Sequence, residues 1–353
     1  MNPWSIWTWP WATTMDMCRR AMESLGEGND AEARGEPEWT TPNRVCIDLA
    51  ALRLRDFSVG KNRRRPALVV APFALHDAVL ADLAPGHSLL EALRANGCSH
   101  LFLVEWKSAT PQTRLHTIDT QLAALNVAVD DIGAPVDLIG LCQGGWLSLV
   151  YAARFPKKVR RLVLAGAPVD MPAGLSALWT PANPMTDVII DELIRLGDGL
   201  VLGRYMATLW PREPDEASRV MDALQFASPP ASDAERRAAE IFVRWDRRAL
   251  DLPGPYYRQV LDWLYRENRL ACGTFPALGR VIDLRGLHCP LYLLAGARDA
   301  IAPPAQVFAA ASLIAGPEGD IETAQADCGH LALFMGQRTL IEEWPRIAQW
   351  LAK

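Results

Sequence analysis

The chain has 353 residues, of which half are hydrophobic and 22% are charged, as is typical of a folded globular protein rather than a disordered one. This length allows one large domain or two of ordinary size. The 36 basic and 41 acidic residues give a net charge of -5. Because phosphate binding needs a concentrated basic surface, this charge argues against a nucleic acid as the partner, although a small anionic substrate stays possible.

Seven cysteines are scattered along the chain, and none forms a CxxC pair. Their odd number and spacing argue against a disulfide framework and against a zinc site. The first residues show no basic segment followed by an apolar run, so no secretory signal is predicted. The longest apolar region, residues 138–153, is too short and too interrupted to span a bilayer. We therefore expect a reduced, cytoplasmic protein without a transmembrane segment.

Four of the 13 tryptophans fall within the first 11 residues: Trp4, Trp7, Trp9 and Trp11. They suggest either a hydrophobic arm that packs on the body of the fold or an anchor on a lipid, polymer or subunit surface. A polar stretch rich in Gly, Glu and Pro follows at residues 26–43 and is typical of a linker. We therefore expect an N-terminal arm and linker over residues 1–43 and a catalytic domain over residues 44–353.

From residue 44, apolar runs alternate with helical patterns. Strands are predicted as a pair within 45–59 and at 66–73, 99–106, 136–142 and 161–167, and helices at 88–96, 115–130 and 143–155. Strands that alternate with helices favour parallel crossovers and a sheet covered by helices on both faces.

The alternation stops at about residue 171. Helical patterns and proline-rich turns continue to about residue 268 without a convincing buried strand. Strand patterns return at 290–295 and 320–324, and an amphipathic helix is predicted at 339–351. We interpret this as one α/β domain with a helical cap inserted at about 171–270.

The strongest local motif is Gly140-Leu-Cys142-Gln-Gly144-Gly145, between a predicted buried strand and a helix. It matches the nucleophile elbow G-x-S-x-G of α/β-hydrolases, with cysteine in place of serine. The glycines allow the sharp turn from strand to helix, where larger side chains would collide. A cysteine at a helix N-terminus is favoured as a thiolate, which predicts Cys142 as a nucleophile.

The order of residues in such enzymes is nucleophile, acid, then histidine. Asp299 follows the predicted strand PLYLLA, and His330 follows the last strand pattern. Both lie at carboxyl ends of strands, where parallel sheets carry their active sites. His288 precedes its strand, at the wrong end of the sheet. The sequence thus predicts Asp299 as the acid and His330 as the base.

An oxyanion hole should complete the site. One donor should be the backbone N–H of Gln143, which follows the nucleophile. The second should come from the loop after the strand at 66–73, near Phe73 or Ala74.

The segment LIGLCQGGWLSLVYAARFPKKVRRLVLAGAPVD resembles the lipase-box region of polyhydroxyalkanoate (PHA) synthases, which carry G-x-C-x-G-G. Further similarities, in the same order, are ADLAPGHSLLEAL with LFLVEWK, WDRRALDLPGPYYRQVLDWLYRENRL, VIDLRGLHCPLYLLAGARDAIAPP, and CGHLALFMG. They span about residues 40–352. The resemblance implies the α/β-hydrolase fold, with Cys142, Asp299 and His330 at the positions of nucleophile, acid and base.

The resemblance also implies a reaction without a cofactor. The Cys142 thiolate would attack the thioester of a 3-hydroxyacyl-CoA, CoA would leave, and the polyester would grow by ester formation at a hydroxyl. His330 would take the thiol proton, and Asp299 would orient the imidazole or help to activate the incoming hydroxyl. The length is similar to that of catalytic subunits that need a second protein, so a partner subunit, or a granule surface bound through the N-terminal arm, is expected.

The chain departs from the usual family pattern after each motif. Ala300 stands where a histidine usually follows the acid, and Leu331-Ala332 stands where Ile-Gly is more usual. Trp146 follows Gly145, where a small or hydroxylated residue is expected, and we predict that it contacts and narrows the substrate path.

Two other functions remain open. A hydrolase, either an intracellular polyester or oligomer depolymerase or a thioesterase, would use the same three residues with water as the acceptor. A non-catalytic protein bound to granules would use the tryptophan arm and would not need Cys142.

Overall fold

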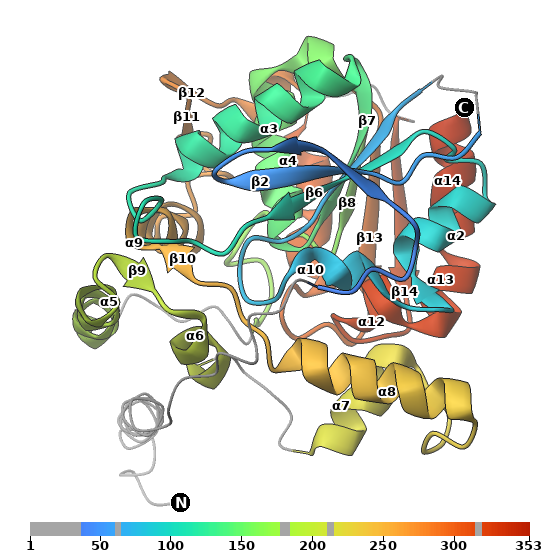
Figure 1. Ribbon diagram of the computed structural model, residues 1–353. Coiled ribbons are helices and arrows are strands. Elements are labelled where there is room, and N and C mark those ends of the chain that lie inside the picture. Colours follow the sequence, from blue (N-terminus) through green and yellow to red (C-terminus); the bar gives the residue numbers. More distant parts are fainter. Residues whose placement is uncertain (1–36, 61–64, 177–183, 210–214, 315–319) are drawn as a thin grey trace, which may run out of the picture.

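The computed structural model describes residues 37–60, 65–176, 184–209, 215–314 and 320–353. The predicted N-terminal arm and most of its linker lie outside these residues. The centre is an eight-stranded sheet in the order β1-β2-β6-β3-β7-β8-β13-β14. Strands β1 and β2 form an antiparallel hairpin, β2 pairs antiparallel with β6, and the other neighbours are parallel. The predicted mostly parallel sheet is thereby confirmed (Figure 1).

The eight strands are β1 (Arg44–Asp48), β2 (Leu52–Asp56), β3 (Ala67–Val70), β6 (Leu101–Trp106), β7 (Val136–Leu141), β8 (Val159–Ala165), β13 (Leu291–Gly296) and β14 (Ile321–Ala326). Two short strands, β4 (Asp82–Ala84) and β5 (His87–Ser88), form a separate antiparallel pair. Each strand predicted from the sequence has its counterpart within two residues at either end, apart from the ends of 45–59 and 66–73, which are loops.

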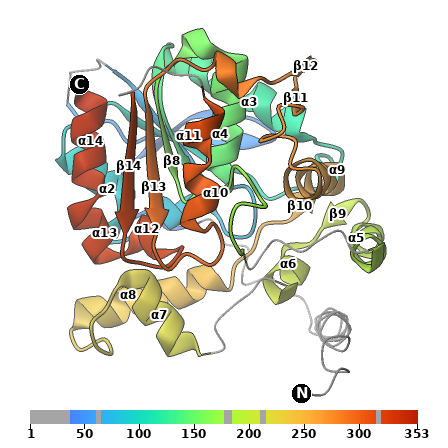
Figure 2. The ribbon, with the colours of Figure 1, turned by 180° about the vertical axis from the view of Figure 1, so that it is seen from behind.

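Both faces of the sheet are buried, and successive residues of a strand enter different cores. In β3, Leu68 and Val70 belong to one apolar cluster, whereas Ala67 and Val69 belong to the other. Helices α3 (Ile118–Ile132), α4 (Gln143–Arg154) and α10 (Pro304–Phe308) contribute to the first cluster. Helices α2 (Leu89–Ala95) and α14 (Trp344–Ala352) contribute to the second. Figures 1 and 2 show these two helical layers on opposite sides of the strands.

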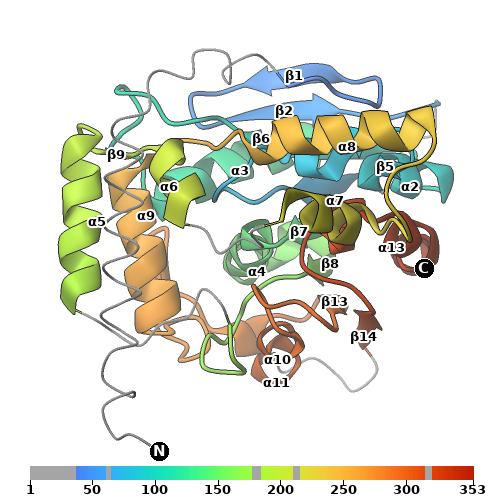
Figure 3. The ribbon, with the colours of Figure 1, turned by 90° about the horizontal axis from the view of Figure 1, so that it is seen from below.

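The segment between β8 and β13 is mainly helical, as predicted. It contains α5 (Pro184–Leu196), α6 (Gly203–Leu209), α7 (Glu216–Leu224), α8 (Asp233–Asp246), α9 (Gly254–Gln259) and the π-helix η5 (Val260–Arg266). Helices α7 and α8 lie side by side below the sheet in Figure 1, and α5, α6 and α9 lie to one side of them (Figure 3).

Short elements in this segment were not expected. Strands β9 (Leu200–Val201) and β10 (Leu252–Pro253) are buried and pair with each other, and β11 (Pro276–Ala277) pairs with β12 (Arg280–Val281). The expectation that no buried strand occurs here was therefore wrong. Two-residue strands are too short to produce the alternation by which a strand is recognised.

The C-terminal helix predicted at 339–351 is divided. The structure has α12 (Ala332–Met335), then α13 (Gln337–Glu342), and starts α14 at Trp344. Pro345 has no N–H for a helical hydrogen bond, but it is accepted in the first turn of a helix, so the break falls just before it. The remaining helical turns in the described part of the chain are η3 (Ala78–Ala81), η4 (Pro156–Lys158), η6 (Leu284–Gly286) and α11 (Ala310–Leu313).

No helix among the described residues is long and apolar enough to cross a membrane.

Candidate active site

Cys142 lies at the sharp turn between β7 and α4. Strand β7 ends at Leu141 and α4 begins at Gln143, so one residue makes the whole turn. Its φ of 50° and ψ of -120° are unusual for any residue with a side chain. Strained backbone of this kind persists where the surroundings hold it and is concentrated at functional sites. The geometry is that of the elbow predicted from the sequence.

The glycines after Cys142 are required by close backbone packing. A Cβ atom on Gly144 would lie 2.2 Å from the carbonyl oxygen of Val70, and one on Gly145 would lie 2.3 Å from the Cβ of Ala167. Both distances are far shorter than any real carbon contact allows. Helix α4 therefore lies directly against the ends of β3 and β8, which fixes Cys142 above the sheet.

Asp299 and His330 form a hydrogen-bonded pair. The Nδ1 of His330 lies 2.7 Å from Oδ2 of Asp299, and both side chains are buried. The other carboxylate oxygen, Oδ1, accepts hydrogen bonds of 2.8 Å from the backbone N–H groups of Ile301 and Ala302. Because backbone N–H donors fix one carboxylate oxygen, the other stays directed at His330, whose Nδ1 faces Asp299 and whose Nε2 is left for Cys142.

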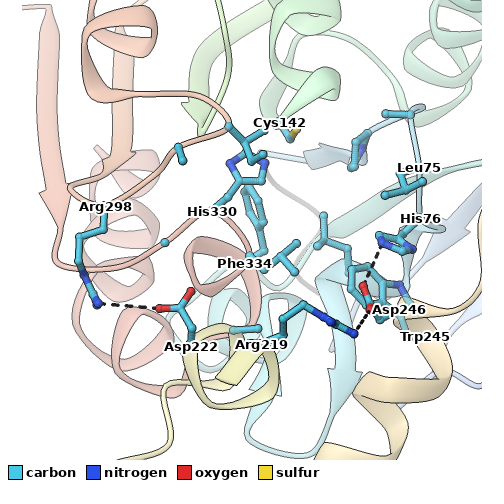
Figure 4. Close-up of a pocket in the computed structure, with 18 of the residues that line it drawn as sticks. Leu75, His76, Cys142, Arg219, Asp222, Trp245, Asp246, Arg298, His330 and Phe334 are labelled. Carbon is cyan, nitrogen blue, oxygen red and sulfur yellow. Dashed lines mark hydrogen bonds and ion pairs between the residues drawn. The ribbon is translucent and has the colours of Figure 1, made fainter. Parts of the chain in front are cut away.

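The electrostatics of this pair favour a charged imidazole. Burial alone lowers the pKa of His330, but the charges of Asp299 and Cys142 and the hydrogen bonds to both side chains raise it well above its ordinary value. A protonated His330 beside Cys142 stabilises a thiolate. Figure 4 shows the two side chains facing each other at the edge of one pocket.

That pocket has a volume of about 590 Å³ and is lined mostly by apolar side chains. One wall comes from loops at the carboxyl ends of strands and carries Cys142 and His330. The opposite wall comes from α7 and the end of α8 (Figure 4). The lining residues from these two helices are Ser218, Arg219, Asp222, Ala223, Trp245 and Asp246.

A cluster of charged and polar side chains that no sequence motif predicted lies in this pocket. Nε2 of His76 lies 3.4 Å from Oδ1 of Asp246, and Oδ2 of Asp246 lies 3.3 Å from a guanidinium nitrogen of Arg219. Nδ1 of His76 lies 2.7 Å from the backbone oxygen of Arg248. Because a carbonyl only accepts, the Nδ1 of His76 carries a proton. These residues come from three distant parts of the chain, and no local motif connects them.

The predicted oxyanion residues differ in their placement. Ala74 lines the pocket together with Cys142. Phe73 is buried, and its ring packs against Trp106 and Tyr256 instead of bordering the pocket. Gln143 occupies the first position of α4, and its side chain donates to the hydroxyl of Tyr265 at 2.6 Å.

Trp146 does not border this pocket. It is fully buried, its ring packs against Phe275 at 5.9 Å, and its indole N–H donates to the side chain of Gln143. The lining of this pocket therefore gives no support to the predicted contact between Trp146 and the substrate, which stays a prediction. The position in the sequence, four residues after the nucleophile, did not reveal that this face of α4 points into the core.

No group of histidine, cysteine and acidic side chains among the described residues could hold a metal ion. Six of the seven cysteines are described, and all six are free thiols.

The comparisons with known proteins agree with this geometry. Residues 111–337 match the family model for the alpha/beta hydrolase fold. The chain belongs to the alpha/beta hydrolase fold family. Among solved structures, a monoacylglycerol lipase of Paleococcus ferrophilus superposes with a TM-score of 0.54 at 15% identity, over 85% of this chain and 98% of the lipase. A bacterial membrane phospholipase A superposes with a TM-score of 0.53 at 17% identity, over 98% and 92% of the two chains. These two likenesses concern the fold alone.

Sequence relatives narrow the family. A poly(3-hydroxyalkanoate) polymerase subunit of Haloferax mediterranei is 25% identical to this chain, over 98% of this chain and 72% of the relative. The subunit of Synechocystis is 29% identical to it, over 81% of this chain and 76% of the relative. The subunit of Allochromatium vinosum is 25% identical over 93% of both chains. The resemblance to PHA synthases inferred from the motifs is confirmed: this chain of the alpha/beta hydrolase fold is similar to polymerase subunits over most of its length.

Proposed function

We propose that the chain is an acyltransferase of the PHA synthase type, which polymerises 3-hydroxyacyl-CoA through an acyl-cysteine at Cys142. The observation that carries the proposal is the cysteine at the elbow beside the His330–Asp299 pair, in a chain whose relatives are polymerase subunits.

In the first step the Cys142 thiolate attacks the carbonyl carbon of the acyl-CoA thioester. The tetrahedral intermediate collapses, the carbon–sulfur bond to CoA breaks, and the CoA thiolate leaves with the proton held by His330. Asp299 keeps Nδ1 of His330 protonated and its ring oriented. Backbone N–H groups of Gln143 and of the loop after β3 stabilise the oxyanion.

In the second step a hydroxyl replaces CoA. His330 removes the hydroxyl proton, the oxygen attacks the acyl-cysteine, and the thiolate of Cys142 leaves as an ester forms. Cysteine suits this sequence of steps because an acyl-cysteine is itself a thioester. Exchange with CoA is therefore nearly balanced, and the acyl group stays activated for transfer to the hydroxyl.

We infer that the segment at about 171–270 acts as a cap within a catalytic domain that begins near residue 44. Support comes from α7 and α8, which form the pocket wall opposite Cys142 and His330 (Figure 4). A cap that covers the acyl-cysteine excludes water and favours a hydroxyl acceptor. The CoA thioester substrate would place the reaction in the cytoplasm.

A second subunit is part of the proposal. The relatives of similar length are named as polymerase subunits, and the chain covers 93% of the one from Allochromatium vinosum. The Trp-rich residues 1–12 are the proposed contact with this subunit or with the surface of a polyester granule.

The test is release of CoA from 3-hydroxybutyryl-CoA by the purified protein, with sizing of the product and Cys142→Ala in parallel. Release that depends on Cys142 and yields polymer is expected. The same release with only free 3-hydroxybutyrate would contradict transfer to a hydroxyl and support the hydrolase reading, and equal release by Cys142→Ala would remove the cysteine from the mechanism. The assay is run with and without co-expressed candidate second subunits.

A further inference from the structure

The loop after β3 is held by two buried side chains that the proposed mechanism does not yet use. The indole N–H of Trp106 donates to the backbone oxygen of Ala71 at 2.9 Å. The hydroxyl of Tyr256, on α9, donates to the backbone oxygen of Phe73 at 3.1 Å. Trp106 and Tyr256 are each about 2% exposed, so water does not compete for either bond.

The second bond fixes the plane of one peptide group. The carbonyl of Phe73 and the N–H of Ala74 belong to the same trans peptide, in which the oxygen and the hydrogen point to opposite sides. A hydroxyl bound to the carbonyl oxygen therefore also sets the direction of the Ala74 N–H. The ring of Tyr256 packs on that of Phe73 at 5.0 Å, which restrains the same residue from a second side.

The residue that supplies the N–H of this peptide borders the pocket. Ala74 lines it together with Cys142 and His330, whereas Phe73 does not border it. An oxyanion formed on the carbonyl carbon attacked by Cys142 needs N–H donors that are already oriented, because reorientation during the reaction would cost free energy.

We propose that Tyr256 is a positioning residue, which orients the backbone N–H of Ala74 as the second donor of the oxyanion hole. This inference rests on the proposed acylation of Cys142 and identifies which loop N–H serves it and what holds that group in place.

Tyr256 suits this role because its hydroxyl stays protonated. Burial, together with the nearby Tyr265 and the charge of Cys142, raises its pKa far above neutrality. The hydroxyl therefore stays a hydrogen-bond donor to the carbonyl oxygen of Phe73 across the neutral pH range.

The test is Tyr256→Phe, with Tyr151→Phe as the matched control. Tyr151 is also fully buried, and its hydroxyl donates to Asn126 at 3.1 Å, near the opposite end of α4 from Cys142. Each variant loses one buried hydroxyl, so the control measures the general cost of that loss on folding and activity.

Two reactions of Cys142 are compared. Acylation by 3-hydroxybutyryl-CoA, or by p-nitrophenyl butyrate as a second donor, passes through an oxyanion, whereas alkylation by iodoacetamide does not. For Tyr256→Phe we expect kcat of acylation to fall about 10–100-fold, a part of the loss seen when a whole oxyanion donor is removed. KM should stay within about threefold, and the alkylation rate and the Tyr151→Phe control should stay near wild type.

Equal losses in acylation and alkylation would overturn the proposal, because Tyr256 would then act on the thiolate. Unchanged acylation would also overturn it, as would an equal fall in Tyr151→Phe. If only the p-nitrophenyl ester acylates the wild-type Cys142, the proposed CoA substrate is wrong and the ester still tests Tyr256. If neither donor acylates Cys142, both proposals fail.

Discussion

Replacing Asp299 by asparagine tests how the His330 ring is held. Asparagine has the same size, and its side-chain oxygen can still accept from the N–H groups of Ile301 and Ala302, which Oδ1 of Asp299 now binds at 2.8 Å. Its NH₂ group then faces Nδ1 of His330, where a carboxylate oxygen lies at 2.7 Å. Because two donors cannot share that contact, Nδ1 must become the acceptor and the proton moves to Nε2. The ring then faces Cys142 in a form that cannot take its proton.

We expect kcat for CoA release by Asp299→Asn to fall by about 10³–10⁴-fold, as when the same exchange forces the wrong tautomer in other triads. This corresponds to about 4–5 kcal/mol of transition-state stabilisation. The exchange also removes the charge that raises the pKa of His330. The imidazolium therefore loses its proton at lower pH, and the thiolate loses its partner near neutrality. Alkylation of Cys142 at pH 7 should therefore be slower in Asp299→Asn than in the wild type.

The assay follows CoA release with 3-hydroxybutyryl-CoA and iodoacetamide labelling of Cys142 between pH 5 and 9. Asp327→Asn is the control, because Asp327 lies three residues before His330 but its side chain is 73% exposed and pairs with Arg298. A fall in both readouts for Asp299→Asn alone is expected. Unchanged labelling with a loss of polymer growth would refute the tautomer argument and assign Asp299 to activation of the incoming hydroxyl.

Three further predictions concern other parts of the chain. Iodoacetamide at neutral pH should label Cys142 fastest. Burial raises the pKa of Cys98 to about 12 and the pKa values of Cys289 and Cys328 to about 11, so these thiols should react slowly. Uniform slow labelling would count against the elbow. Gly144→Ala should destabilise the protein by about 1–3 kcal/mol in urea titrations, because the added Cβ would meet the Val70 oxygen. Gly286→Ala is the control: its Cβ would meet nothing within 4 Å, so stability should change by less than about 0.5 kcal/mol. Deletion of residues 1–12 should weaken binding to polyester granules or to a second subunit in sedimentation assays and leave the fold intact, and loss of folding would support a packed arm instead.

The sequence was sufficient for the features that depend on local pattern. Apolar runs predicted the parallel strands because both faces of the sheet are buried, and β3 contributes alternate residues to the two cores. The glycine motif predicted the elbow because close approach of α4 to β3 leaves no room for a Cβ. The order of Asp299 and His330 along the chain was enough to propose them as a pair, since carboxyl ends of parallel strands share one edge.

Features that depend on tertiary packing were not accessible from the sequence. Trp146 was expected in the substrate path, but the direction of its face of α4 depends on what packs against that helix, here Phe275. The cluster of His76, Arg219 and Asp246 joins the loop after β3 to α7 and α8. More than a hundred residues of sequence separate this loop from the two helices. Tyr256 carries no motif either, because its relation to the site runs through a backbone carbonyl of a distant loop.

The groups proposed to react and the pocket wall opposite them come from different parts of the fold. Cys142, His330 and Ala74 follow strands of the sheet, whose register fixes their mutual distances. The facing wall comes from α7 and α8, which pack apolar residues such as Leu224 and Phe242 into the second core cluster and pair with the loops through His76–Asp246 and Arg298–Asp222. We therefore expect the acceptor and the acyl chain length to depend on the α7–α8 wall. Substitutions in the α7–α8 wall should alter KM and product, and those after the strands should alter kcat, because only the latter hold the reacting atoms.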